Sequence, residues 1–276
     1  MGLYQIFKDA AYERMTRHGF IHQSNVFIRI LGGEIVQAVT VEPITSYDVT
    51  AAIFPLCQPP VDLFWEGKKP YFAEQYTVEF DYSKFPYVIC SQDYQSERKY
   101  YSVEPFLGKR QEYVDYTIKN LEKAAEQIEE NFIPILDKIC DIDSYLDWMQ
   151  NGCEGVRHSW WLESPILLHK SCLDGDFEWG NRYVEKYLGT KYEKDLSSLF
   201  KSYKILPVSD DIWKNDPSFA IIKEEMARRD EIYFHRFKNF YEYRDKNDID
   251  GAKTFIEAQR ERTLDTLRKK YSKLKL

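Results

Sequence analysis

The chain has 276 residues, of which 43% are hydrophobic and 16% aromatic, and its formal net charge is −7. This apolar content excludes a disordered chain. The acidic balance argues against a surface for nucleic acid or anionic lipid spread over the whole molecule, because phosphate repels negative charge.

The cysteines and the apolar runs bear on where the protein works. The five cysteines are scattered and form no C-x-x-C pair, which predicts reduced thiols rather than disulfides or a structural zinc site. No apolar run approaches the ~20 residues that cross a bilayer, and polar side chains interrupt the first fifteen residues, unlike a signal peptide. We therefore expect a soluble protein of the cytoplasm that makes no membrane contact.

The first predicted elements are a helix and a β-hairpin. The helix ends before Gly19, a residue that takes the left-handed conformation just past a helix at no steric cost. Apolar alternation then predicts strands over 26–31 and 35–41. Between them, Gly32 and Gly33 predict a hairpin turn rather than a phosphate-binding loop, since no third glycine follows and both flanks are strands.

Further strands are predicted by shorter alternating or apolar runs at 47–53, 76–81, 85–90 and 100–106. Short connections favour an antiparallel meander, and the first helix is expected to cover its apolar face.

The hydrophobic period changes at Tyr113 to that of an amphipathic helix, which continues to Ile139. Pro134 lies inside this helix, where it removes a backbone donor, so we expect a kink or a restart near Asn131. Asp143 is predicted to cap the next short helix, and Gly152 to end it.

The rest of the chain is predicted to be helical. Ser164 and Pro165 indicate an N-cap followed by a first-turn proline, and a long helix is expected over 219–240. Two stretches share a capping aspartate and, four positions on, a small residue that allows close helix packing, namely Asp176 with Gly180 and Asp248 with Ala252. This pattern is typical of helical hairpins.

Taken together, these elements predict an α+β fold in two domains. The first, residues 1–110, is a helix packed on an antiparallel β-meander, and the second, residues 111–276, is an all-α region of helical hairpins.

Several short motifs in the first part of the chain carry a family resemblance. They are the helix ending in Gly19-Phe20, the Phe27-x-Arg29 strand, the Ile35-Val36-Gln37 strand, and the Asn131-Phe132-Ile133-Pro134 segment leading into Asp143-x-x-Leu146. Over roughly its first 150 residues the chain resembles a bacterial domain-of-unknown-function family, numbered four-three-zero-four. The resemblance supports the fold and implies no activity, because the family has none to transfer.

No signature of a common catalytic or cofactor site is present, since G-x-x-x-x-G-K-[ST], G-x-G-x-x-G, H-E-x-x-H and G-x-S-x-G are all absent. We therefore predict no cofactor. The candidates for acid and base catalysis are Glu79 and Asp81, whose carboxylates lie on one side of a predicted strand, ~7 Å apart. The solvent face of any sheet gives the same pattern, and nothing in the sequence would raise one of the two pKa values.

Histidine and cysteine residues near the middle of the chain are a second candidate for chemistry. They are Cys153, His158, Ser159, His169 and Cys172. On one helix the two histidines would be ~16 Å apart, too far for one metal ion, and Pro165 separates them in any case. We predict no metal site.

The candidate binding region is the stretch 54–75, which has four prolines, no helical period and many aromatic residues. Loops of this length are uncommon in compact domains and are often functional. Two interpretations stay open: the aromatic side chains cover the core as a lid, or they form a binding loop. In a binding loop the contact residues would be Trp65, Lys68, Lys69 and Tyr71, because large aromatic side chains supply anchor area.

Residues 268–276 carry five positive charges. Lysines at the end of a helix complement its dipole, which explains these charges without a ligand. The alternative is an anionic partner, whose binding would depend on salt.

These observations favour a bacterial accessory protein of the cytoplasm that binds another protein and has no catalysis of its own. An immunity-type role, in which an acidic protein neutralises a toxin, is a specific version that rests on charge. The alternative is a hydrolase that uses Glu79 and Asp81 on a sugar or other small substrate. Nucleic-acid binding through the C-terminal lysines ranks below both, and no small-molecule ligand is identified.

Overall fold

The computed structural model describes residues 3–23, 25–42, 47–58, 65–66, 69–70, 78–80, 84–85, 89–90, 110–152, 156–157 and 162–274. The chain divides into two compact units. Unit 1 contains residues 1–161 and 258–276, and unit 2 contains residues 162–257.

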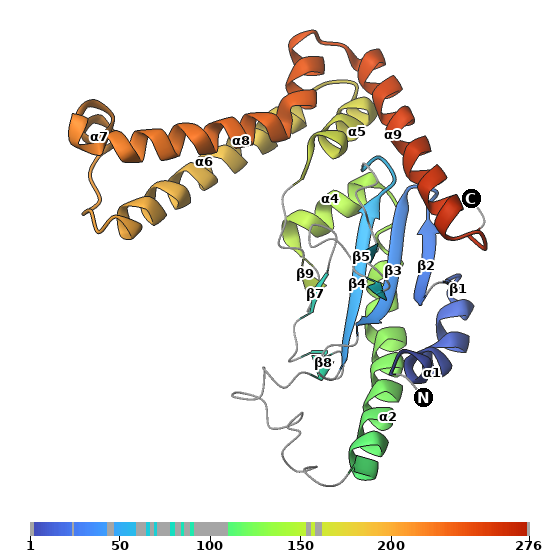
Figure 1. Cartoon of the computed structure of the whole chain (residues 1–276). Coiled ribbons are helices and arrows are strands. Elements are labelled where there is room, and N and C mark those ends of the chain that lie inside the picture. Colours follow the sequence, from blue (N-terminus) through green and yellow to red (C-terminus); the bar gives the residue numbers. More distant parts are fainter. Residues whose placement is uncertain are drawn as a thin grey trace. The chain divides into compact units, whose positions relative to one another are not determined.

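The centre of unit 1 is an antiparallel sheet (Figure 1). Its strands are β1 (Ile21–Gln23), β2 (Val26–Leu31), β3 (Ile35–Glu42), β4 (Tyr47–Pro55) and β8 (Ile89–Cys90), in the order β1-β2-β3-β4-β8. Two short ribbons accompany it: β5 (Trp65–Glu66) pairs with β6 (Lys69–Pro70), and β7 (Glu79–Phe80) pairs with β9 (Val156–Arg157). The antiparallel meander predicted from the sequence is confirmed for β2 to β4, and β1, which was not predicted, adds an edge strand beside β2.

The glycine pair after β2 forms the predicted hairpin turn. Leu31 faces Ile35 across the ladder, and Gly32 and Gly33 both have positive φ angles, +60° and +72°. These angles suit the tight turn whose twist matches that of its strands. Position 32 also requires glycine because a Cβ there would lie 1.9 Å from the carbonyl oxygen of Cys140.

The helices of unit 1 precede and follow the sheet in sequence. They are α1 (Leu3–Arg17), α2 (Arg110–Gln127), the π-helical turn η3 (Ile128–Phe132), α3 (Ile133–Leu136), α4 (Ile142–Asn151) and residues 258–270 of α9 (Ile249–Lys270). Gly19 follows α1 with a φ of +81°, as its sequence context predicts.

Pro134 produces the predicted restart of the long helix. The N–H of Ile133 donates to the carbonyl of Ile128, five residues back, so one π-helical turn separates α2 from α3. Proline lacks an N–H, and the wider turn moves the helix past the position where that donor is missing. Gly152 ends α4 with a φ of +68°, as expected. The predicted cap Asp143 is wrong, because Asp141 is the N-cap and forms a capping box with Ser144.

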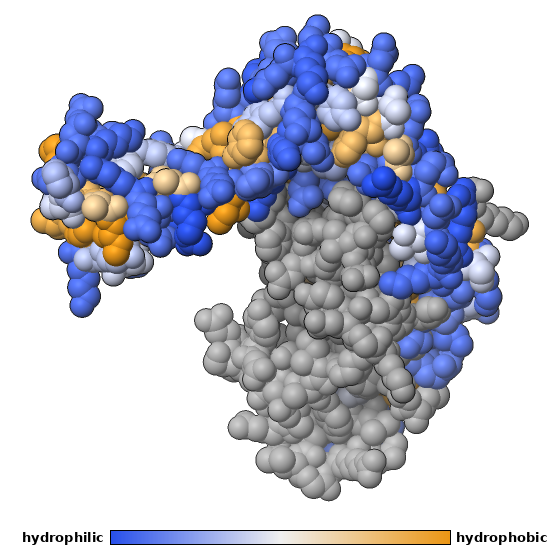
Figure 2. All heavy atoms as spheres, turned by 45° about the horizontal axis from the view of Figure 1, so that its top comes forward, coloured by the Kyte–Doolittle hydropathy of each residue, from blue (hydrophilic) through white to orange (hydrophobic). Residues whose placement is uncertain are grey.

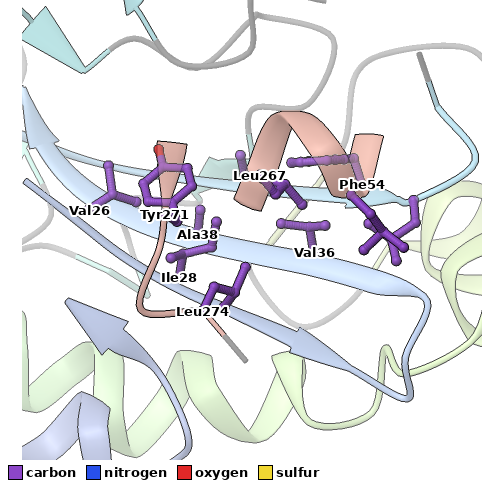
Figure 3. Packing of buried hydrophobic residues seen from close by; sticks show 11 residues of the cluster. Val26, Ile28, Val36, Ala38, Phe54, Leu267, Tyr271 and Leu274 are labelled. Carbon is purple, nitrogen blue, oxygen red and sulfur yellow. The ribbon is translucent and has the colours of Figure 1, made fainter. Parts of the chain in front are cut away.

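Helices cover both faces of the sheet. On one face the ring of Phe7, from α1, meets that of Phe27 at 6.2 Å between centroids. On the other face the end of α9 and the residues after it pack against the strands, as Figure 3 shows for Leu267, Tyr271 and Leu274 over Val26, Ile28, Val36, Ala38 and Phe54. The sequence analysis predicted only the cover provided by α1. A run such as Val26-Phe27-Ile28, with every side chain buried, is typical of a strand covered on both sides.

One polar cluster lies inside this layer arrangement. The guanidinium of Arg29, which is 5% exposed, donates to the side chain of Gln37 (2.8 Å), the carbonyl of His18 (2.7 Å) and Asp137 (2.6 Å). The amide of Gln37 donates to the carbonyls of Leu136 (2.7 Å) and Ile139 (2.9 Å). Burial lowers the pKa of Arg29, and the bond to Asp137 opposes that effect. The cluster joins α1, two strands and the end of α3.

The predicted domain boundary at residue 110 differs from the division in the structure. Helices α2, α3 and α4 lie in unit 1, together with the end of α9. The hydrogen bonds from Gln37 to the end of α3 give the physical reason, because they hold this segment on the sheet.

Unit 2 is helical, as predicted. It contains α5 (Ser164–Asp174), α6 (Glu178–Ser202), α7 (Asp210–Asn215), the short 3-10 helix η4 (Pro217–Phe219), α8 (Ala220–Asp245) and residues 249–257 of α9. Asp248 is confirmed as the cap of α9, because its carboxylate accepts the backbone N–H of Gly251. The predicted cap Asp176 is wrong, because Phe177 is the N-cap of α6 and Asp176, one residue earlier, accepts the N–H of Glu178. Ser164 is not an N-cap, because Glu163 takes that position and the Ser164 hydroxyl donates to a carbonyl of α8.

Helices α6 and α8 form an antiparallel hairpin within unit 2 (Figure 1). Phe177, near the start of α6, meets Phe240, and Phe200, near its end, meets Phe219 before α8. Gly180 allows the close approach that its spacing predicted, because a Cβ there would lie 2.5 Å from the ring of Phe240. None of the helices that the structure describes is long and apolar enough to cross a membrane.

Candidate functional site

The sites predicted from the sequence lie mostly outside the described residues. Trp65 belongs to β5, Lys69 to β6 and Glu79 to β7, but their side chains lie outside the described part of the chain. Neither the backbone nor the side chain is described for Lys68, Tyr71 and Asp81. The binding loop and the carboxylate pair therefore stay predictions.

The histidine and cysteine cluster is described only in part. Cys153, His158 and Ser159 lie outside the described residues, whereas Cys172 is a free thiol in α5. Burial raises the pKa of the Cys172 thiol, which disfavours the reactive thiolate. Over the ranges that the structure covers, no group of His, Cys, Asp and Glu side chains could hold a metal ion.

An apolar groove on the α6–α8 hairpin is the strongest candidate site. It has a volume of about 720 Å³. Its lining comes from α6 (Leu188, Gly189, Tyr192, Glu193 and Leu196), from α7 (Asp210) and from α8 (Asp230, Tyr233, Phe234 and Tyr241). We call this set the hairpin groove. Figure 2 shows hydrophobic atoms in patches on the surface of the hairpin.

One wall of the hairpin groove is fixed by α7. Asp210 accepts hydrogen bonds from the Tyr192 hydroxyl (2.8 Å), the Trp213 indole (3.0 Å) and the Lys214 ammonium (2.5 Å). These donors, Lys214 first, hold the pKa of Asp210 at about 2. Trp213 is buried in the core cluster at this end of the hairpin, together with Leu196. The short helix is thus anchored by both polar and apolar contacts.

Asp195 of α6 joins the two helices beside the groove. Its carboxylate bonds to the guanidinium of Arg229 (2.6 Å) and accepts the hydroxyl of Tyr233. Burial raises the pKa of Tyr233, and the bond to Asp195 adds to that rise. Tyr233, which lines the groove, is therefore held between the two helices.

The apolar side chains of the hairpin groove reach solvent. Phe234 is 54% exposed and stacks on Tyr241, with 5.7 Å between ring centroids and 25° between planes. Gly189 faces open space, because a Cβ there would meet no atom within 4 Å. A large aromatic side chain held in one orientation at the edge of an open groove suits the insertion of a partner side chain.

The charged side chains that line the groove are all acidic. They are Glu193, Asp210 and Asp230. Partial burial and the nearby charge of Asp195 raise the pKa of Asp230, so a cation beside this carboxylate would be stabilising. The groove therefore combines apolar anchors with negative charge.

Sequence analysis predicted the two helices but missed the groove. A signal was present, because Leu188, Tyr192 and Leu196 continue the row of four-residue steps that begins with Gly180 and Val184. Such a row turns about 40° around the helix with each step, so it passes from one face of α6 to another and gives the helix more than one surface to cover. Which of those faces has no cover depends on the packing of the other helices.

No family model, curated protein or solved structure matches the chain. The resemblance of the first half to family four-three-zero-four therefore stays a prediction.

Proposed function

We propose that the chain is a non-catalytic binding protein that recognises another protein through the hairpin groove. The observation that carries this proposal is the half-exposed Phe234, held against Tyr241 beside an apolar groove. Exposed apolar surface of this kind, with a polar rim, is typical of interaction sites. Covering one such side chain stabilises a complex by about 1–2 kcal/mol, since full burial of a Phe or Leu contributes ~1.5–3 kcal/mol.

The occupant that fits best is an amphipathic helix of the partner with a basic residue beside its apolar anchors. The groove runs between two helices, and helix-in-groove recognition uses apolar residues at helical spacing. Glu193 and Asp230 supply the negative charge that a lysine or arginine of the partner would meet.

The charge of the whole chain supports an immunity-type version of this function. A net charge of −7 steers association with a basic partner, such as a cationic toxin. The thiols of Cys140 and Cys172, which form no disulfide among the described residues, fit a cytoplasmic location, where cysteines stay reduced.

Site-specific photo-crosslinking of the full chain in its source cells tests the proposal. The photoreactive residue p-benzoylphenylalanine replaces Phe234 in one variant and Ile221 in the other. Ile221 is the matched control, because it lies on the same helix and is 46% exposed but does not line the groove. The expected result is one cross-linked protein from position 234, joined through a segment with apolar and basic residues, and none from position 221.

The groove variant Leu188→Asp completes the test. It should abolish the cross-link from position 234, because a carboxylate would replace an apolar anchor among existing negative charges. A cross-link that is equal from both positions, or that survives Leu188→Asp, would contradict the proposal.

A further inference from the structure

The stacked rings of Phe234 and Tyr241 have a guanidinium beside them at one end. Tyr241 lies two helical turns after Phe234 on α8, and the two ring centroids are 5.7 Å apart. The guanidinium of Arg244, one turn further on, lies over the Tyr241 ring at 4.6 Å from its centroid. It also donates to the carboxylate of Asp245 at 2.6 and 2.8 Å. One arginine therefore contacts an aromatic face and a carboxylate at the same time, which a planar cation with several N–H donors allows.

The Phe234 end of the stack has a ring and a carboxylate but no cation from the groove. Asp230 precedes Phe234 by four residues, so the two side chains are neighbours on one side of α8. Both line the hairpin groove, and Phe234 is 54% exposed. His235 meets the edge of the Phe234 ring but is not among the lining residues. None of the described residues that line the groove is a lysine, an arginine or a histidine.

The arginines next to Asp230 in the chain are paired with other carboxylates. Arg228 pairs with Glu225 at 2.9 Å, and Arg229 pairs with Asp195 at 2.6 Å. Over the ranges that the structure describes, Asp230 has no hydrogen-bond or ion-pair partner. Burial raises the pKa of Asp230, and the charge of Asp195 raises it further. A cation beside Asp230 would therefore offset a repulsion between two carboxylates.

The other two acidic residues of the groove are less suited to hold a cation against Phe234. Asp210 already accepts hydrogen bonds from three donors of α6 and α7. Glu193 lies on α6, the helix that does not carry Phe234. Asp230 is thus the carboxylate that combines a free position with an adjacent aromatic face.

We propose that the hairpin groove selects an arginine of its partner, whose guanidinium stacks on Phe234 and bonds to Asp230. This inference rests on the proposed function and names the side chain that the groove recognises. A guanidinium is planar and weakly hydrated, so it can lie on a ring while its N–H groups reach a carboxylate. The ammonium group of lysine is a compact and strongly hydrated point charge. Asp230 is therefore the specificity-determining residue of the groove.

Titration of the full-length protein with two small cations tests the proposal. The probes are n-propylguanidinium, which is the side chain of arginine, and n-butylammonium, which is the side chain of lysine. Both are added as chlorides at constant ionic strength, and NMR follows the ring signals of Phe234 and Tyr241. Phe219, which is partly buried and is not among the lining residues, is the internal reference.

The expected result is a saturable shift at Phe234 and Tyr241, but not at Phe219, with n-propylguanidinium. The affinity for n-butylammonium should be at least about fivefold lower, because its head group cannot stack on the ring. Equal affinities for the two cations, or shifts that do not saturate, would overturn the proposal.

Single variants assign the two contacts. Asp230→Asn should weaken binding of n-propylguanidinium about fivefold, as expected for the loss of one exposed ion pair. Glu231→Gln is the matched control, because Glu231 is the next residue, about 100° around the helix, and is not among the lining residues. Phe234→Leu keeps an apolar side chain but removes the aromatic face, so the preference for n-propylguanidinium, read at Tyr241, should be lost. Circular dichroism confirms that each variant is folded. An affinity that Asp230→Asn leaves unchanged, or that Glu231→Gln lowers equally, would also overturn the proposal.

The outcome of this titration is separate from that of the photo-crosslinking, because the titration needs no partner protein. A protein that cross-links at position 234, with no preference of the groove for n-propylguanidinium, would refute the arginine and support the proposed function. Selective binding of n-propylguanidinium, with no protein cross-linked at position 234, would support the guanidinium site and contradict the proposed function.

Discussion

The sheet of unit 1 and the helical hairpin of unit 2 differ in how completely their apolar side chains are covered. In unit 1, helices pack on both faces of β2 and β3, so consecutive side chains such as Val26, Phe27 and Ile28 are fully buried. In unit 2, exposed large apolar side chains recur along the hairpin and its connection, among them Leu206, Ile212, Ile221, Ile232 and Phe234. Unit 1 therefore uses its apolar residues for stability, whereas unit 2 leaves part of them at the surface, where the proposed partner would cover them.

Polar groups follow the same division. The Arg29–Gln37 cluster of unit 1 is buried and satisfies several backbone carbonyls, so its loss would leave unpaired groups inside the protein. The ion pairs of unit 2 include exposed pairs one helical turn apart, such as Arg182 with Glu178 and Lys238 with Glu242. Exposed pairs of this kind contribute little, about 0.3–0.5 kcal/mol each.

The largest effect should come from truncating matched phenylalanines in the two units. Phe27→Ala removes a fully buried ring and should lower the free energy of unfolding by about 3–5 kcal/mol. Phe234→Ala should lower it by less than about 1 kcal/mol, because that ring is half exposed. Urea denaturation measures both. Similar losses would refute the assignment of different roles to the two surfaces.

The buried polar cluster should give the next largest effect. Gln37→Leu removes the donor to the carbonyls of Leu136 and Ile139 and the acceptor of the Arg29 Nε–H, which should cost about 3 kcal/mol of unfolding free energy. Gln127→Leu is the matched control, since that amide also donates to a carbonyl, at the surface. Its cost should stay below about 1 kcal/mol. Thermal or urea denaturation measures the loss of unfolding free energy in the two variants. Equal losses would contradict the prediction that the buried cluster stabilises unit 1.

Two glycines of α6 compare a closely packed position of the helix, Gly180, with one in the open groove, Gly189. Gly180→Ala should destabilise by about 1–3 kcal/mol, because the new Cβ collides with the ring of Phe240. Gly189→Ala should stabilise by about 0.5–1 kcal/mol, since alanine favours a helix and its Cβ meets open space. The two changes have the same chemistry and opposite signs. Destabilisation by Gly189→Ala would mean that the groove is filled.

The smallest effect is a pH dependence at α7. The pKa of Asp210 is depressed to about 2, so its contribution is present above the ordinary aspartate pKa of about 3.8 and is lost as the pH falls through about 2. The Trp213 indole N–H signal of the folded protein in NMR should therefore shift with a midpoint near pH 2. Asp210→Asn should abolish the shift, whereas Asp211→Asn, one residue on, should keep it. A shift that survives Asp210→Asn would assign the effect to another group.

Much of the secondary structure could be predicted because its signals are local. Gly19, the Gly32-Gly33 pair and Pro134 each act on backbone within a few residues, and the structure has the helix end, the turn and the restart where these residues place them. Some of the errors were also local: the cap of α4 is Asp141 rather than Asp143, and that of α5 is Glu163 rather than Ser164. In each case the cap lies within two residues of the predicted one.

The candidate site could not be located in the same way. The hairpin groove depends on which face of α6 and α8 has no cover, and helical periodicity shows only that several faces are apolar.

The sequence by itself determined the end of α1, the hairpin turn between β2 and β3, the restart of the helix at Pro134, the antiparallel order of β2 to β4, and the acidic character of the chain. Only the tertiary structure decided that α9 covers the second face of the sheet, that Lys273 reaches β1, and that the hairpin leaves Phe234 exposed. Turn and cap preferences depend on backbone sterics within a few residues. Packing instead brings together surfaces far apart in the chain, and each apolar face can be buried against more than one partner.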